Sequence, residues 1–381
     1  MTRKGTAFST RPFCQPLGDI GEHANRPGDD WRSTMRMIAL AIATVIIAGA
    51  AGTATAEQCL VPTIVFSSTR DYPTVGGPNS NEIYLIDPDG TNPVRLTNND
   101  AADWLPKLSP DGKRVVFDSN RARGAGEPVN TVDLFLMRAD GKDQTRLTRG
   151  ASATWSPDGK YIAFHRSASG TGLPINPNPS AATVDSDIFV IRVPDDDEPV
   201  DEPINITNSP GQVDDDPDWS PDGKRIVFTR HPDTENSALS PFPYPSQRIY
   251  VLDLDAGVAE QLSHSDVEER APAWSPDGTR IAYMCRIGTN FLNVPTFEIC
   301  VMNADGSDQT RLTFNGLNDG TPSWSPDGQR IFFHRSQPGQ GSPQLFVMNA
   351  DGTEQTQLTF PPGNNQLASR GVVRAKCAED N

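Results

Sequence analysis

Two histidines occupy equivalent places in a repeated sequence, and each is followed by an arginine. His165-Arg166 and His334-Arg335 come directly after the aromatic residue that ends a short β-type run, and Thr229-Arg230 holds the same place between them. An imidazole can ligate a metal or act as a base near neutral pH, so these histidines are candidates for a metal site or for catalysis. The alternative is structural, because repeats duplicate residues that pack and hydrogen-bond alike. The arginines are expected to pair with carboxylates or to bind an anionic ligand.

Acidic residues gather before the tryptophan-containing motif of successive repeats. They are Asp100, Asp103, Asp214, Asp215, Asp216, Glu268, Glu269 and Asp319. Carboxylates around a channel mouth could attract a cation or a basic partner, and the alternative is a solvated acidic rim. The sequence contains no Gly-x-Ser-x-Gly elbow, no P-loop, no dinucleotide fingerprint and no Cys/His cluster. It therefore predicts no cofactor and no assigned catalytic residue, and it favours a binding protein over an enzyme.

The repeat itself is a tight turn between two short strands. Trp-Ser-Pro-Asp-Gly occurs at 155–159, 219–223, 274–278 and 324–328, with a variant at 108–112. Proline presets φ and glycine accepts a positive φ, so each copy predicts a β-hairpin. A second unit follows, in which a strand and an Asp-Gly turn lead to a closing Leu-Thr or related pair. The closing pairs begin at 96, 147, 206, 262, 312 and 358.

Two hairpins in every fifty-odd residues supply the four strands of one propeller blade. The repeat therefore predicts an all-β fold. We expect a six-bladed β-propeller of four-stranded antiparallel blades, occupying residues 57–377. The repeated tryptophans are expected to pack between blades, because identical placement in successive blades is what packing requires. They are Trp155, Trp219, Trp274 and Trp324.

The tryptophan hairpin with its downstream Asn-Ala-Asp-Gly and Leu-Thr, clearest at 303–313 and 349–359, resembles the WD40-like (PD40) repeat of TolB-type propellers. The resemblance covers roughly residues 60–375. TolB itself carries an α/β domain ahead of its propeller, and here the first expected strand, 63–67, follows the apolar segment almost directly, so a role in the Tol–Pal system is not expected. The family that the repeat resembles also includes polysaccharide lyases that use a metal at the channel. The alternative function is therefore a carbohydrate-active or metal-dependent, lyase-like enzyme at the channel mouth.

The chain offers six closing pairs but five Ser-Pro-Asp-Gly hairpins, so the first blade lacks an inner strand of its own. Repeating the spacing of the preceding blade from the last closing pair reaches Arg370. We expect the segment 367–375 to supply the missing strand beside 63–67 and to leave no open edge.

Cysteine pairing follows from this closure. Cys59 and Cys377 flank the two strands and are predicted to form a disulfide, with two unpaired thiols as the alternative. Cys285 and Cys300 are expected on the second and third strands of one blade, where a disulfide could bridge directly opposed residues.

The loops between second and third strands are long and varied, and we name the surface they form the long-loop face. They span 68–81, 120–131, 167–186, 231–247, 286–296 and 336–343. Binding usually resides in long loops on a rigid frame, so this face is the predicted surface for a protein partner. The formal net charge of −16 argues against nucleic acid and against an anionic membrane surface. A monomer is expected.

The N-terminal region carries an export pattern. Residues 37–52 form the only strongly apolar run, preceded by Arg32 and Arg36 and followed by Ala54-Thr55-Ala56. This predicts a signal peptide over 35–56, cleaved after Ala56. The alternative is a retained membrane anchor, for which the run is short. Residues 1–34 are expected to be unstructured or to precede the true start, and the mature chain to be periplasmic or extracellular.

Overall fold

The computed structural model describes residues 58–71, 81–124, 127, 131–167, 186–194, 200–232, 247–289, 295–336, 343–361, 363 and 365–376. The expected N-terminal extension and signal peptide lie outside these residues. All regular structure within them is β-strand. Since they contain no helix, none of them forms an apolar helix of the length a bilayer requires.

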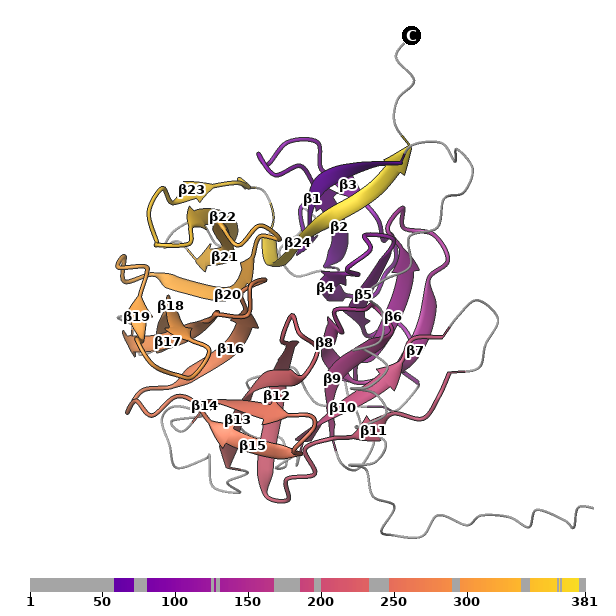
Figure 1. Cartoon of the computed structure of the whole chain (residues 1–381). Helices are drawn as coiled ribbons and strands as arrows, with labels where there is room; N and C mark the ends of the chain where they lie inside the picture. Colours follow the sequence, from indigo (N-terminus) through magenta and orange to yellow (C-terminus); the bar gives the residue numbers. More distant parts are fainter. Residues whose placement is uncertain are drawn as a thin grey trace, which may run out of the picture. The chain divides into compact units, whose positions relative to one another are not determined.

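The strands form antiparallel sheets of one repeating design, shown in Figure 1. One sheet has the order β24-β1-β2-β3 and contains β24 (Asn365–Lys376), β1 (Gln58–Ser68), β2 (Glu82–Ile86) and β3 (Val94–Arg95). Three further four-stranded sheets follow the chain order. They contain β4 (Asp103–Leu108), β5 (Arg114–Ser119), β6 (Asp133–Arg138) and β7 (Thr145–Arg149); β16 (Glu269–Trp274), β17 (Arg280–Thr289), β18 (Pro295–Asn303) and β19 (Thr310–Arg311); and β20 (Asn318–Trp324), β21 (Arg330–Ser336), β22 (Gln344–Asn349) and β23 (Thr356–Gln357).

The remaining strands form one eight-stranded sheet. It contains β8 (Ala151–Trp155), β9 (Tyr161–Ser167), β10 (Ser186–Arg192), β11 (Ile204–Asn205), β12 (Gln212–Trp219), β13 (Arg225–Pro232), β14 (Arg248–Asp253) and β15 (Val258–Gln261). Within it, β8 to β11 and β12 to β15 each repeat the four-stranded pattern. A single parallel residue pair, Ser186 with Val213, joins the two halves.

The predicted hairpin turns are confirmed, and their sequence explains their geometry. In the turn after β12, the amide of Gly223 donates to the carbonyl of Ser220 at 2.9 Å, and Gly223 has a φ of 71°. The Ser220 hydroxyl donates to Asp222 at 2.5 Å and accepts the Arg225 amide at 2.9 Å. Serine and aspartate thus satisfy the turn locally, while glycine supplies the positive φ.

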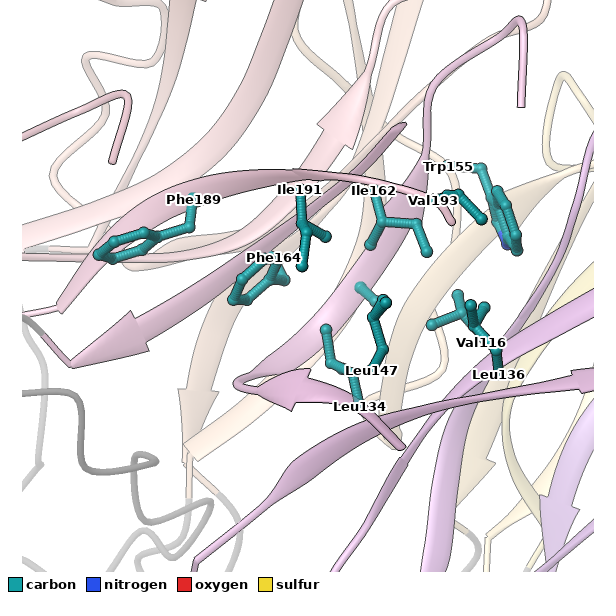
Figure 2. Close-up of a cluster of buried hydrophobic side chains, with 11 residues drawn as sticks. Val116, Leu134, Leu136, Leu147, Trp155, Ile162, Phe164, Phe189, Ile191 and Val193 are labelled. Carbon is teal, nitrogen blue, oxygen red and sulfur yellow. The ribbon is translucent and has the colours of Figure 1, made fainter. Parts of the chain in front are cut away.

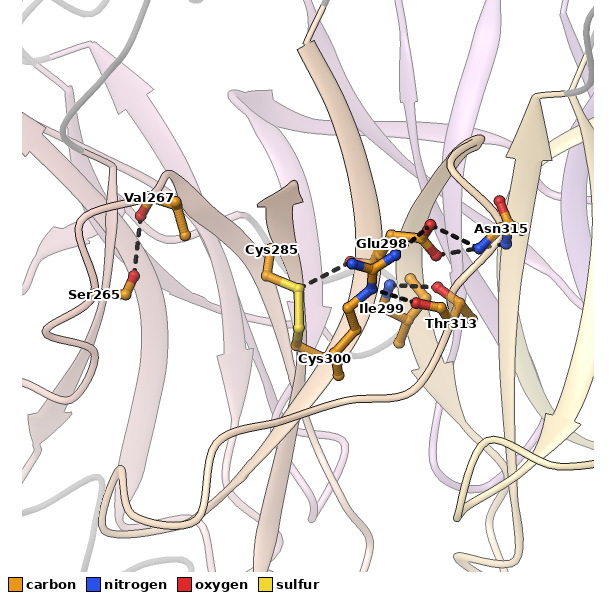
Figure 3. Close-up of a disulfide and its surroundings, with 9 residues drawn as sticks. Ser265, Val267, Cys285, Glu298, Ile299, Cys300, Thr313 and Asn315 are labelled. Atoms are coloured by element: carbon orange, nitrogen blue, oxygen red, sulfur yellow. Dashed lines mark hydrogen bonds and ion pairs between the residues drawn. A yellow bond between two sulfur atoms is a disulfide. The ribbon is translucent and has the colours of Figure 1, made fainter. Parts of the chain in front are cut away.

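The closing Leu-Thr pair has two structural roles. The hydroxyl of Thr313 accepts the Ile299 amide at 3.0 Å, so the threonine satisfies a third-strand donor beyond the short last strand (Figure 3). The leucine carbonyl receives the Asp-Gly turn of the next sheet so closely that a Cβ would not fit there. A Cβ on Gly352 would lie 2.8 Å from the carbonyl oxygen of Leu312. This contact explains why the turn ends in glycine.

Hydrophobic clusters join each four-stranded unit to the next. Figure 2 shows the cluster between β5–β7 and β8–β10, in which Trp155 packs with Val116, Leu136 and Ile162. The four repeated tryptophans are 5 to 6 % exposed, which confirms that they are core residues. Their placement between units stabilises the arrangement by burying apolar surface on both sides.

The predicted closure by the C-terminal segment is confirmed. β24 pairs antiparallel with β1, with Ile64 opposite Arg370 and Gln58 opposite Lys376; the yellow β24 lies beside the indigo β1 in Figure 1. A Cβ on Gly90 would lie 2.3 Å from the carbonyl oxygen of Leu358, so the first and last sheets also touch through the Asp-Gly turn. The C-terminal strand therefore completes the first sheet, and the Asp-Gly turn packs this sheet against the last one.

The Cys285–Cys300 disulfide is present between β17 and β18 (Figure 3). Its position differs from the expectation, because the cysteines are not directly opposed. Cys285 faces Glu298 and Cys300 faces Tyr283, so the bridge runs diagonally. Diagonal neighbours on one face of an antiparallel pair are still within reach of a disulfide. The predicted Cys59–Cys377 bridge stays a prediction, because Cys377 lies outside the described residues.

Candidate functional site

The inner strands of several sheets surround a cavity of about 70 Å³, large enough for a few water molecules. Its walls come from β4, β8, β12, β16 and β20. The lining residues are Leu105, Pro106, Lys107, Ser152, Ala153, Asp216, Pro217, Asp218, Ala271, Pro272, Thr321 and Pro322. The cavity combines a proline-rich apolar surface with two carboxylates, one ammonium and two hydroxyl groups.

Each of these five strands bulges where it borders the cavity. The pairing register of β12 with β13 shifts between Asp215 and Asp218, and the other four strands shift at the equivalent place. The first bulged residue has a positive φ in every case, at Leu105, Ser152, Asp216, Ala271 and Thr321. A bulge with a left-handed residue reverses which side chains face the channel.

Side chains from the preceding four-stranded unit accept hydrogen bonds from the amides of three of these bulged residues. The Ser152 amide donates to Asp118 at 3.0 Å, the Asp216 amide to His165 Nδ1 at 3.4 Å, and the Ala271 amide to Thr229 at 3.1 Å. Asp118, His165 and Thr229 occupy equivalent places on their second strands. His165 therefore has a structural role, as the acceptor of the Asp216 amide.

The two candidate histidines border the channel through different partners. His165 is 7 % exposed, and burial lowers its pKa against the opposing charge of Asp216. His334 shares a hydrogen bond of 2.7 Å with the Thr321 hydroxyl, and burial lowers its pKa to about 4. Both rings are therefore neutral at pH 7, and the bond from the Asp216 amide requires Nδ1 of His165 to be unprotonated. Among the described residues, no group of three histidine, cysteine or acidic side chains is arranged to hold a metal ion.

The expected acidic rim is largely internal. Asp214 and Asp319 are both fully buried, and each makes a bidentate pair with an arginine of its own sheet. Arg230 donates to Asp214 at 2.6 and 2.7 Å, and Arg335 donates to Asp319 at 2.7 and 2.8 Å. A solvated rim is therefore wrong for these carboxylates. The prediction that the arginines pair with carboxylates is confirmed for both arginines.

The predicted site residues Glu268, Glu269 and Arg166 do not share one kind of contact. Glu268 lies 3.8 Å from Arg270 and 3.9 Å from Arg286, and burial raises its pKa. Glu269 is 1 % exposed. The guanidinium of Arg166 stacks 4.2 Å from the Phe189 ring centre, as a cation–π contact. These side chains pack against their own sheets.

The sequence did not point to one carboxylate that lies buried behind the cavity-lining Ser152. Asp118 is 0 % exposed, accepts only the Ser152 amide through Oδ2, and has no hydrogen-bond partner for Oδ1 among the described residues. Burial and the charge of Asp216 raise its pKa well above the usual value. The available signal was its alignment with His165 and His334, one residue after the last aromatic of its second strand.

The long-loop face is only partly described. Segments 72–80, 168–185, 233–246, 290–294 and 337–342 of these loops lie outside the described residues. The strands that carry these loops are described. Buried arginine pairs such as Arg230 with Asp214 lie directly beneath the loop origins.

Residues 230–375 match the family model described as PD40, TolB beta propeller domain. The uncharacterized protein Atu1656 of Agrobacterium fabrum is 29 % identical over 53 % of this chain and 61 % of its own length. The Protein TolB homolog of Chlorobaculum tepidum is 31 % identical over 18 % of this chain and 24 % of its own. The chain thus spans about three fifths of the first relative and a quarter of the second.

Two solved structures share the fold. TolB from Acinetobacter baumannii superposes with a TM-score of 0.60 at 18 % identity, covering 81 % of this chain and 66 % of that chain. Putative TolB from Agrobacterium tumefaciens gives a TM-score of 0.54 at 17 % identity, covering 83 % and 99 %. Residues 230–375 are thus similar to the PD40/TolB propeller family, and the likeness to the two solved structures shows that the chain has a β-propeller fold.

Proposed function

We propose that the chain is an exported six-bladed propeller that acts as a binding or scaffold module for a protein partner through its long-loop face. The blade number rests on counting each half of the eight-stranded sheet as one blade. Each half has its own bulge, its own Ser-Pro-Asp-Gly turn and its own closing pair. One parallel residue pair between the halves does not merge them into one unit.

The observation that carries the binding function is the rigid base beneath the long loops. Arg230 and Arg335 leave the second strands where the loops begin, and each is fixed by a buried carboxylate and stacked on two aromatic rings. Loops on such a base present side chains from a preorganised frame, which lowers the entropy cost of binding. In this base Arg230 and Arg335 are already paired with Asp214 and Asp319, so these charged groups are engaged in structural ion pairs.

The test compares loop variants of the full chain for partner capture. In one variant a short Gly-Ser linker replaces residues 233–246, and in the control Lys160→Ala and Lys224→Ala alter the opposite, tight-turn rim. We expect proteins cross-linked from an envelope extract to be captured by the wild type and the control, and lost by the loop variant, at unchanged melting temperature. Equal capture by all three would contradict the proposal.

The same samples separate the enzymatic alternative. Elemental analysis and thermal-shift screening against glycans would report a bound metal or sugar, since a ligand that binds the native state raises its melting temperature. A stoichiometric metal that is lost on His165→Gln and His334→Gln would favour the lyase-like function at the channel mouth instead.

A further inference from the structure

Two carboxylates on one side of the cavity are connected through one serine. Ser152 donates its amide to Asp118 and its hydroxyl to Asp216, each at 3.0 Å. Asp215 precedes Asp216 on β12, and Ser152 and Asp216 line the cavity. The serine therefore holds a buried carboxylate behind it and an accessible carboxylate beside it.

These carboxylates have acceptors left over. Oδ1 of Asp118 and Oδ1 of Asp215 are both buried without a hydrogen-bond partner among the described residues. Asp218 on the same strand is a contrast, because it accepts the Thr154 hydroxyl at 3.0 Å and the Trp274 amide at 2.8 Å. Neither Asp118 nor Asp215 lines the cavity. An unpaired buried carboxylate is nevertheless costly, so the Asp118–Asp216 side of the cavity favours a group that brings positive charge.

We propose that this wall of the channel binds a primary alkylammonium group, with Asp216 and Ser152 in contact with it and Asp118 reinforcing the negative field from behind. An ammonium is a compact charge with three donors, which suits one carboxylate and one hydroxyl in a small space. No three described acidic, histidine or cysteine residues are placed to hold a metal ion, which favours an organic cation.

The rest of the cavity suits an alkyl stem. Pro106, Pro217, Pro272 and Pro322 line it with apolar surface. A chain of methylene groups buries its surface against such rings while its charged end stays at the carboxylates, as lysine side chains do at protein surfaces. The ligand class is therefore a free alkylamine or the lysine side chain of a partner. This site does not rest on the long-loop face.

The first experiment titrates the purified full chain with n-butylammonium chloride and follows binding by NMR. Matched controls are n-butyltrimethylammonium chloride, which has the same charge without N–H donors, and sodium chloride at equal ionic strength. We expect saturable shifts for butylammonium alone. Equal shifts with the trimethyl compound would overturn the proposal, because the recognition would then need no hydrogen bonds.

Variants locate the site. Asp216→Asn keeps the shape and tolerates the left-handed backbone. Ser152→Ala removes the hydroxyl that donates to Asp216 and would accept from the ammonium. We expect each, and Asp118→Asn, to weaken butylammonium binding about tenfold, equal to about 1.4 kcal/mol. Asp255→Asn, on an exposed turn, is the control and should bind as the wild type does. Unchanged affinity in Asp216→Asn would overturn the assignment.

A last comparison distinguishes the two sources of the ammonium. A lysine-containing peptide and its Nζ-acetylated form are titrated beside butylammonium. If the unmodified peptide binds more tightly than both its acetylated form and butylammonium, the ligand is a lysine side chain. If the peptide and butylammonium bind with equal affinity, the ligand is a free amine. The variant lacking 233–246 should retain butylammonium binding, so failure of the long-loop proposal leaves this one standing.

Discussion

At the scale of single residues, the charged groups around the channel divide into paired and unpaired. Asp214 and Asp319 have their charges matched by arginines at hydrogen-bond distance. Asp118 has an amide donor only. Removing a charge should change the stability of the fold in opposite directions for the two kinds. Breaking a buried pair leaves the partner charge unpaired and destabilises the fold, whereas neutralising a lone buried carboxylate removes its desolvation cost and stabilises the fold.

Replacing Arg230 by methionine should destabilise the protein by about 3–5 kcal/mol, because the buried Asp214 carboxylate loses its bidentate partner. Urea unfolding measures the change. The control is Arg138→Met, which breaks the exposed 3.0 Å pair with Asp140 and should cost about 0–1 kcal/mol. Equal losses in the two variants would show that burial of the pair contributes nothing.

Asp118→Asn should stabilise the protein at pH 7.5 by about 1–3 kcal/mol. The pKa of Asp118 is raised on folding, so the stability that its proton contributes is present below the pKa of the unfolded chain and is lost as the pH rises toward the folded value. Asparagine does not titrate. The gain over the wild type should therefore shrink between pH 7.5 and pH 4.5, as followed by urea unfolding, and a gain independent of pH would argue against a titrating Asp118.

At the scale of strands and turns, the closing threonine explains a recurrent part of the repeat. Thr313→Val keeps the side-chain shape but leaves the buried Ile299 amide without its acceptor, and should cost about 1–3 kcal/mol. Thr310→Val, three residues earlier on an exposed strand, is the matched control and should be near neutral. Thermal unfolding of the pair measures the difference, which vanishes if the hydroxyl has no such role.

Local signals in the sequence predict most of the strands and turns, because Pro-Asp-Gly, Asp-Gly and the closing pairs each satisfy their own backbone. The bulges escaped prediction, since Leu105, Ser152, Asp216, Ala271 and Thr321 share a backbone conformation but no residue type. A bulge changes which side chains face the channel, so the burial of Asp214 and the lone Asp118 carboxylate could not be read from alternation alone. The diagonal geometry of the Cys285–Cys300 disulfide could not be predicted either, because the sequence does not give the pairing register of β17 and β18.

At the scale of the whole molecule, the pairing of β1 with β24 brings two distant segments together. Gln58 and Lys376 are opposite one another, so a short linker can join them. A circular permutant with this linker and new ends within 168–185 should fold with a melting temperature close to that of the wild type.

The companion variant ends at residue 364 and lacks β24. It should lose cooperative unfolding and associate through the exposed edge of β1, as size-exclusion chromatography would detect. A truncated chain as stable as the permutant would mean that strand pairing at the closure contributes little.

The closure also sets an order in time. Ser68 of β1 donates a hydrogen bond to Asn365, which is synthesised 297 residues later. During translation the sheets in between can assemble as they emerge, whereas the earliest strand waits with one edge unsatisfied until nearly the last residues are made. The slow step of maturation should therefore be a single late docking event, and factors that shield nascent chains would act longest on the segment that was made first.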